Sequence, residues 1–176
     1  VRYSNSPVGP YDELIVFPGC YQFKDTTYYR ISQIYVSSME SVVNGRRNWA
    51  VPKKLAIFRW TDNYTRVQIS LPGEDQPFCT LRVRPRLYCL PAGSGLVPAS
   101  FRTLLQPALD DNGPPERYFR ITPTCSGWFR PWVQLVDFQT DGKEIPSEKD
   151  LPVYRFGVGY EAFTLVFPEA EEILIE

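Results

Sequence analysis

The sequence of 176 residues contains no histidine. Histidine is the usual general base near neutral pH and a common metal ligand, so its absence excludes Ser-His-Asp and Cys-His nucleophile systems and His-ligated metals. Any chemistry must therefore use lysine, glutamate, aspartate, tyrosine or arginine. No motif in the chain predicts a metal site or a cofactor.

Long apolar runs and an excess of positive charge are missing too. No stretch approaches the roughly 20 apolar residues that span a bilayer, and the net charge is only −1. We therefore expect neither a membrane nor nucleic acid as a partner, and we predict a cytoplasmic protein. The length and a hydrophobic content of 43% predict one globular domain over residues 1–176.

Cysteine is sparse, and its four occurrences are far apart. None of them forms the close pair that zinc sites and redox motifs require. This spacing favours reduced thiols over disulfides, which stay open as an alternative. The residues are Cys20, Cys79, Cys89 and Cys125.

What the chain has in abundance are turn residues, with 17 prolines and 11 glycines. The segments between them are rich in β-branched and aromatic residues, and residues 65–71 alternate apolar and polar side chains as a half-buried strand does. The sequence therefore predicts a mainly β protein. The expected strands are Glu13–Phe17, Tyr28–Val36, Leu55–Trp60, Thr65–Leu71, Phe78–Leu87, Arg117–Thr122, Trp128–Phe138 and Ala162–Phe167.

One short helix is expected after the strand that ends at Val36. Ser37 and Glu40 have the spacing of a capping box, with Ser37 as the N-cap, and Gly45 is placed to end the helix. Pro52 would then release the chain into the next strand. Lys53 and Lys54 are thus expected where that strand begins.

The segment Gly157–Ala162 has the letters of a dinucleotide-binding fingerprint. That motif needs a helix directly after it, whereas the next residues of the chain are β-rich. We interpret it as a glycine-containing turn between strands.

The chain has only five lysines, and two of them, Lys53 and Lys54, are adjacent. Lysines at a strand edge often serve only to discourage sheet association. However, apolar residues flank this pair on both sides, so a desolvated amine is plausible. A solvated lysine, with a pKa of about 10.4, is neutral in roughly one molecule in 2500 at pH 7, and burial favours the neutral, nucleophilic form.

Four segments of the chain, at the family's spacing, resemble the acetoacetate decarboxylase family: Ser6–Glu13, Gly45–Arg46, Pro52–Leu55 and Phe167–Glu171. The similarity extends over nearly the whole chain and begins after the family's N-terminal portion, which this sequence is expected to lack. The resemblance implies a closed, cone-like antiparallel β-barrel with one or two short helices. It also implies a homo-oligomer that acts on a small-molecule keto acid.

The same resemblance implies the roles of individual residues. Lys53 would form a Schiff base with a substrate ketone, and Lys54 would promote its reactivity. Glu13, two residues after Tyr11, would lie at the active site. Because neighbours on a strand point to opposite faces, we expect Lys54 to face away from Lys53 and desolvation to be the main activating effect.

Substrate contacts are expected from Arg46, Tyr11 and Trp49. Arg46 is a candidate to attract the substrate anion, although it could instead cap the preceding helix. Two departures from the family pattern bear on the pocket. Arg47 replaces an acidic residue, and Trp49 replaces a small one.

These observations predict a lyase that decarboxylates a β-keto acid through a lysine iminium. Related members use the same lysine for aldol or dehydration chemistry on larger keto acids, which is one alternative. The other is a small-molecule-binding barrel without catalysis, suggested by the aromatic content of 15%.

Overall fold

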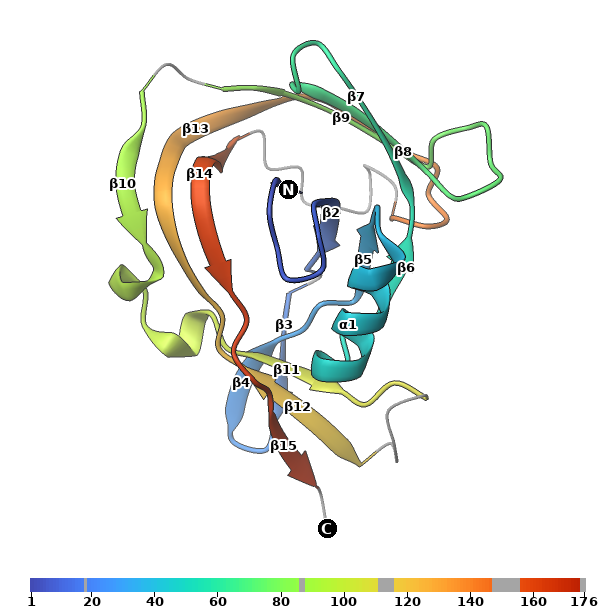
Figure 1. Ribbon diagram of the computed structural model, residues 1–176. Coiled ribbons are helices and arrows are strands. Elements are labelled where there is room, and N and C mark those ends of the chain that lie inside the picture. The colour runs from blue at the N-terminus through green and yellow to red at the C-terminus, as the bar shows by residue number, and fades with distance from the viewer. Residues whose placement is uncertain (18, 86–87, 111–115, 147–155, 175–176) are drawn as a thin grey trace. The chain divides into compact units, whose positions relative to one another are not determined.

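The computed structural model describes residues 1–17, 19–85, 88–110, 116–146 and 156–174, and these residues form strands, two short 3₁₀ helices and one α-helix (Figure 1). The prediction of a mainly β fold is confirmed. The chain divides into two compact units, which are described separately. The first contains Val1–Leu55, Ser94–Cys125 and Leu165–Glu176, and the second contains Ala56–Gly93 and Ser126–Thr164.

A four-stranded sheet in the first unit contains the segment with the lysine pair. Its strand order is β1 (Arg2–Tyr3), β2 (Tyr11–Val16), β5 (Gln33–Val36) and β6 (Lys53–Leu55). The first three strands pair antiparallel, whereas β5 and β6 are parallel. Parallel neighbours need a crossover connection. Helix α1 (Met39–Trp49) supplies it and lies alongside both strands (Figure 1).

The two ends of α1 differ from the sequence prediction. The N-cap is Ser38, whose hydroxyl accepts a hydrogen bond of 3.1 Å from the backbone N–H of Ser41. Ser37 is instead occupied with the sheet, where its hydroxyl accepts from the backbone N–H of Asp12 at 2.8 Å. The predicted cap was therefore wrong by one residue, because a tertiary contact engages the first serine.

The helix also continues past Gly45, where the sequence predicted its end. It ends at Ala50, which has a left-handed backbone (φ 50°) and donates its N–H to the carbonyl of Arg46. A glycine inside a helix costs about 1 kcal/mol relative to alanine, but it does not stop the helix. The reason for a glycine at this position lies in the packing of Lys53, described below.

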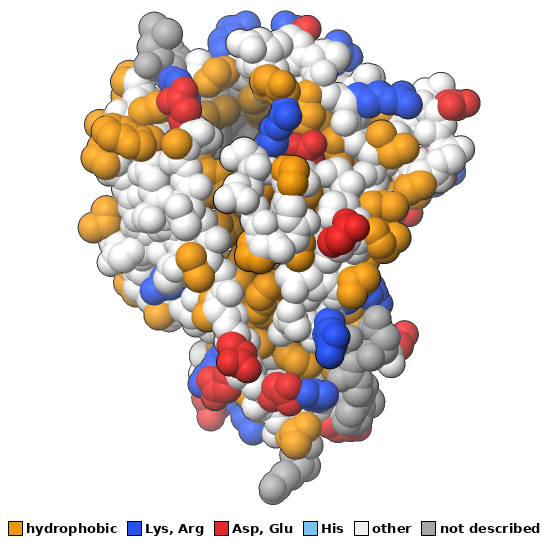
Figure 2. Space-filling view, viewed as in Figure 1, with side chains coloured by type: hydrophobic (Ala, Val, Ile, Leu, Met, Phe, Trp, Pro, Cys, Tyr) orange, Lys and Arg blue, Asp and Glu red, His pale blue; other side chains and the backbone are white. Residues whose placement is uncertain are grey.

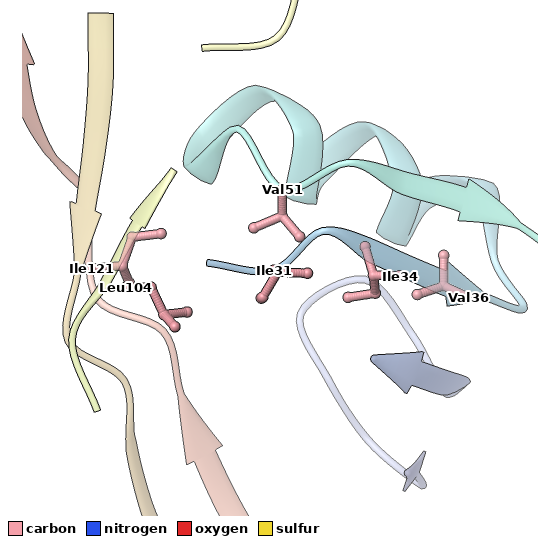
Figure 3. Close-up of a cluster of buried hydrophobic side chains, with 6 residues drawn as sticks. All are labelled: Ile31, Ile34, Val36, Val51, Leu104 and Ile121. Atoms are coloured by element: carbon pink, nitrogen blue, oxygen red, sulfur yellow. The ribbon is translucent and has the colours of Figure 1, made fainter. Parts of the chain in front are cut away.

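The core of the first unit is a cluster of aliphatic side chains (Figure 3). Its members come from the segment before β5, from β5 itself, from the turn before β6, and from strands β11 (Leu104–Pro107) and β12 (Arg117–Ile121) of a second sheet. Each of these side chains is at most 4% exposed. The members are Ile31, Ile34, Val36, Val51, Leu104 and Ile121.

The second sheet of this unit has five strands, in the order β15 (Glu171–Leu174), β12 (Arg117–Ile121), β11 (Leu104–Pro107), β4 (Thr26–Tyr29) and β3 (Cys20–Phe23). Among the described residues it has two free ends and is therefore open. Ion pairs join β12 to β15, between Arg117 and Glu172 and between Arg120 and Glu171. Figure 2 shows acidic and basic side chains intermixed in this region.

The first unit also corrects one strand prediction. Residues Tyr28–Val36 form two strands, β4 and β5, and these belong to different sheets. The β-branched and aromatic composition predicted the strand character but could not reveal a change of sheet between them. The 3₁₀ helices η1 (Ser94–Leu96) and η2 (Ala99–Phe101) complete this unit.

The second unit is built on one sheet. Its order is β10 (Leu90–Gly93), β13 (Thr124–Thr140), β9 (Cys79–Arg84), β8 (Arg66–Ser70) and β7 (Ile57–Thr61), with β14 (Phe156–Val166) also paired to β13. The predicted Leu55–Trp60 strand is divided between β6 and β7. The end of the predicted Phe78–Leu87 strand lies outside the described residues.

The glycine-containing segment Gly157–Ala162 lies within β14 and is not the predicted turn. At Gly159 a larger residue would collide with β13, because its Cβ atom would lie 2.6 Å from the Val133 side chain. This glycine therefore allows the two strands to pack closely.

In the described part of the chain, the four cysteines form no disulfide with one another.

No described helix has the length and apolar character needed to cross a bilayer.

Candidate active site

The register of the four-stranded sheet places Glu13 and Lys53 on the same face. Glu13 lies opposite Val36, and Lys53 lies opposite Ile34. Directly paired residues share a face, as do residues two apart on one strand. Glu13, Val36, Ile34 and Lys53 therefore all point to the face that carries the aliphatic core.

Lys53 ends in a buried polar cluster on this face. Its Nζ atom lies 3.2 Å from Oε2 of Glu13 and donates a hydrogen bond of 2.9 Å to Oγ of Ser41. The side chains of Lys53 and Glu13 are only 9% and 4% exposed, and Ser41 is 1% exposed. Such a buried ion pair is net neutral whether the proton is on the amine or on the carboxylate. Glu13 and Lys53 therefore lie within hydrogen-bond reach of each other in a buried environment.

Two tyrosines form the next layer of the cluster. Tyr3 donates a hydrogen bond of 2.9 Å from its hydroxyl to Oε1 of Glu13, and its ring lies 4.7 Å from that of Tyr11. The Tyr11 ring in turn lies 5.1 Å from Nζ of Lys53, within the range of a cation–π contact. The amine is thus bounded by a carboxylate, a hydroxyl and an aromatic ring.

Both phenols stay protonated near neutral pH. Burial, together with the negative charge of Glu13, raises the pKa of Tyr3 far above its ordinary range. Burial is also the main reason that the pKa of Tyr11 rises to about 12. In the folded protein these side chains can donate hydrogen bonds or line a pocket, but they cannot act as bases near pH 7.

The position of the amine depends on Gly45. A Cβ atom at Gly45 would lie 2.5 Å from Cδ and 2.6 Å from Cε of Lys53. The absence of a side chain therefore leaves the space along α1 that the lysine methylenes occupy. Ser41 lies one helical turn earlier on the same face, so it meets the lysine at its Nζ end.

Lys54 lies on the opposite face of β6 from Lys53. It is exposed, and its Nζ atom sits 5.8 Å from the ring of Tyr35, its partner in the register. The strand alternation that separates the two lysines was expected from the sequence. The structure does not bring Lys54 into the polar cluster.

Of the predicted substrate contacts, Tyr11 lies at the cluster, whereas Trp49 packs elsewhere. Arg46 follows Gly45 on α1 and so points about 100° around the helix from it. Trp49 donates its indole N–H to the carbonyl of Pro168 at 2.8 Å and packs on Phe167. Trp49 therefore ties α1 to the Phe167–Glu171 segment.

Sequence reasoning missed Ser41 and Tyr3. The sequence does not indicate a role for Ser41, because serine is an ordinary polar residue in a short helix. Its partnership with Lys53 emerges only once α1 is packed on β6. Tyr3 lies on a strand of two residues, too short to be recognised from its pattern.

Comparison with known families decides the relationship of this chain. The sequence profile described as acetoacetate decarboxylase matches residues 1–149. The chain belongs to this family. No curated protein matches the sequence closely enough to add to this assignment.

Solved structures support the fold of an acetoacetate decarboxylase family member. The enzyme of that name from Legionella pneumophila has a TM-score of 0.61 at 15% identity, covering 98% of this chain and 70% of that one. A second acetoacetate decarboxylase structure has a TM-score of 0.51 at 16% sequence identity, and the match covers 96% of this chain and 69% of that one. The enduracididine biosynthesis enzyme MppR, complexed with pyruvate, has a TM-score of 0.51 at 13% identity, and the match covers 94% of this chain and 66% of that one.

Proposed function

We propose that this protein is a Schiff-base lyase that decarboxylates a small β-keto acid, with Lys53 as the nucleophile. The observation that carries the proposal is the buried Lys53 amine, held 3.2 Å from the Glu13 carboxylate in a member of the acetoacetate decarboxylase family. A lysine beside an acid in a desolvated cluster can lose its proton without leaving a net charge behind.

The reaction begins when Lys53 passes a proton to Glu13 and its neutral amine attacks the ketone carbon. The carbinolamine then loses its hydroxyl group as water, for which Glu13 can return the proton. The product is a protonated imine on Lys53. Both steps require the carboxyl group within hydrogen-bond reach of the amine, which is where Glu13 lies.

The carbon–carbon bond to the carboxylate then breaks. Its electron pair moves toward the iminium nitrogen, so CO₂ leaves and an enamine remains. Protonation of the enamine carbon and addition of water release the ketone and restore the amine. The low exposure of Lys53 and Glu13 strengthens the electrostatic effect of the iminium on this step.

A second candidate is the use of the same imine for aldol or dehydration chemistry on a larger keto acid. Arg47 and Trp49, where the decarboxylases have an acid and a small residue, favour this possibility. The fold similarity to MppR, a biosynthetic enzyme whose structure contains pyruvate, is in line with it. Both candidates share the Lys53 imine and differ in the reaction that this imine then undergoes.

Several wider features also belong to this proposal. We expect the closed barrel, the single domain over residues 1–176, the homo-oligomer and the cytoplasmic location that the sequence predicted. Arg46 as an anion-attracting residue, Trp49 as a substrate contact and Lys54 as an activating neighbour likewise stay predictions.

The first test is covalent trapping. The protein is incubated with acetoacetate and with pyruvate in the presence of borohydride, and the intact mass and tryptic peptides are measured. A reduced adduct on Lys53 is expected with at least one of these keto acids. Release of CO₂ from acetoacetate without borohydride would then favour decarboxylation over the second candidate.

The matched controls are Lys53→Ala and Lys54→Ala. The first should abolish the adduct, whereas the second removes an adjacent lysine and should retain it. An adduct that persists in Lys53→Ala would contradict the assignment of the nucleophile. Keto acid binding that survives this substitution, with no adduct in the wild type, would favour the non-catalytic barrel.

A further inference from the structure

We propose that Ser41 is a positioning residue that orients the neutral Lys53 amine for attack on the carbonyl. This inference rests on the proposed Schiff-base function. It assigns a role to a side chain that the sequence did not single out.

The geometry around the amine is the basis of the proposal. Nζ of Lys53 has two oxygen neighbours on different elements: Oγ of Ser41 on α1 at 2.9 Å and Oε2 of Glu13 on β2 at 3.2 Å. Both neighbours are buried. The amine is therefore held from the helix side and from the sheet side at once.

A neutral primary amine has two N–H bonds and one lone pair. Ser41 accepts one of these hydrogens, and the Glu13 carboxyl, 3.2 Å away, contacts the nitrogen from a second side. Without Ser41, one hydrogen has no fixed acceptor and the amine can rotate about its Cε–Nζ bond. Ser41 thus restricts the orientations of the amine.

The surroundings of Ser41 fix the position of its hydroxyl. The residue is 1% exposed, so solvent does not compete for its hydroxyl. One turn later, Gly45 leaves the space through which the Lys53 methylenes reach it. The pair Ser41 and Gly45 on one face of α1 therefore sets both the path and the end point of the lysine side chain.

The test compares Ser41→Ala with the wild type in the rate of borohydride-trapped adduct formation on Lys53. The maximal rate should fall by at least about tenfold, while the concentration of keto acid giving half that rate changes little, because orientation and not substrate binding is lost. The ratio of the two rates should also stay constant as pH rises to the range where the amine is neutral. A deficit that vanishes at high pH would show that Ser41 acts on protonation, and would overturn the proposal.

Ser38→Ala is the matched control. It removes a serine hydroxyl from the same helix and takes away the N-cap, but it leaves both contacts of the amine in place. Its trapping rate should equal that of the wild type even if its melting temperature falls. If Ser38→Ala and Ser41→Ala slow trapping equally, the effect arises from helix stability and the proposal fails.

Ser41→Cys nearly preserves the shape of the side chain but replaces the hydroxyl oxygen with sulfur. It also provides a second variant for this test if Ser41→Ala does not fold. Sulfur is a weak acceptor, so this variant should trap nearly as slowly as expected for alanine. A wild-type rate in Ser41→Cys would contradict the need for the oxygen. A wild type that forms no adduct at all would instead refute the Schiff-base function, so the two failures are distinguishable.

Discussion

Two ion pairs in the first unit, one buried and one at the surface, differ in how much solvent screens the attraction between their charges. Glu13 and Lys53 face the core between β2, β6 and α1, with side chains at most 9% exposed. Arg120 and Glu171 join β12 to β15 at the surface, with side chains 39% and 59% exposed. The residue types are similar, but the solvent around them is not.

At the surface, water and salt screen the attraction, and such pairs contribute little to stability. In the buried cluster, each charge depends on its partner because water cannot replace it. Under the proposed function, a proton moves from Lys53 to Glu13 without creating net charge, so the buried pair would prepare a nucleophile.

The largest effect is expected when one carboxylate is removed from the buried pair and, in a separate variant, one from the surface pair. Glu13→Gln leaves a buried ammonium without its carboxylate and should lower the free energy of unfolding by about 3–5 kcal/mol. Glu171→Gln should lower it by less than about 1 kcal/mol. Urea unfolding of both variants gives the two values, and equal losses would show that burial does not distinguish the pairs.

The second test moves the buried pair without changing its charges. Gly45→Ala introduces a methyl group where the Lys53 methylenes lie. The lysine must shift, so trapping of a keto acid on Lys53 should slow by roughly 100-fold. The stability should change less, since alanine favours the helix by about 1 kcal/mol.

Asn48→Ala provides the control for Gly45→Ala because it also places an alanine in α1, on an exposed residue. It should leave trapping unchanged. Trapping at the wild-type rate in Gly45→Ala would show that the lysine reaches its position by another path.

The third test uses the tyrosine beside the amine. The pKa of Tyr11 is raised from 10.0 to about 12, mainly by burial, so the neutral phenol is favoured in the folded state. Its contribution to stability is complete below about pH 10 and is lost as pH rises toward 12. The wild type should therefore lose stability relative to Tyr11→Phe across this range.

Urea midpoints of the wild type and Tyr11→Phe at pH 8, 10 and 11 measure this difference. It should be constant between pH 8 and 10 and then change in favour of the phenylalanine variant. A constant difference at all three pH values would contradict the raised pKa.

The smallest effect is expected at the surface pair. A double-mutant cycle with Arg120→Ala and Glu171→Ala should give a coupling of about 0.2–1 kcal/mol that decreases in 1 M salt. A larger coupling that salt does not reduce would place this pair in the same class as Glu13 and Lys53.

The sequence by itself determined the mainly β character, most strands of the second unit, the presence of α1 and the family. These features depend on local patterns or on matched segments, and local patterns are visible in the chain. It also indicated that Lys53 and Lys54 face apart, because alternation is a property of any strand.

Only the tertiary structure decided which residues surround the amine. Ser41, Gly45 and Tyr3 meet Lys53 and Glu13 through the register of β1, β2, β5 and β6 and the packing of α1. It also moved the helix cap to Ser38 and placed Trp49 against Phe167 and Pro168. Contacts between residues far apart in the chain depend on how the elements pack, and no local pattern records that packing.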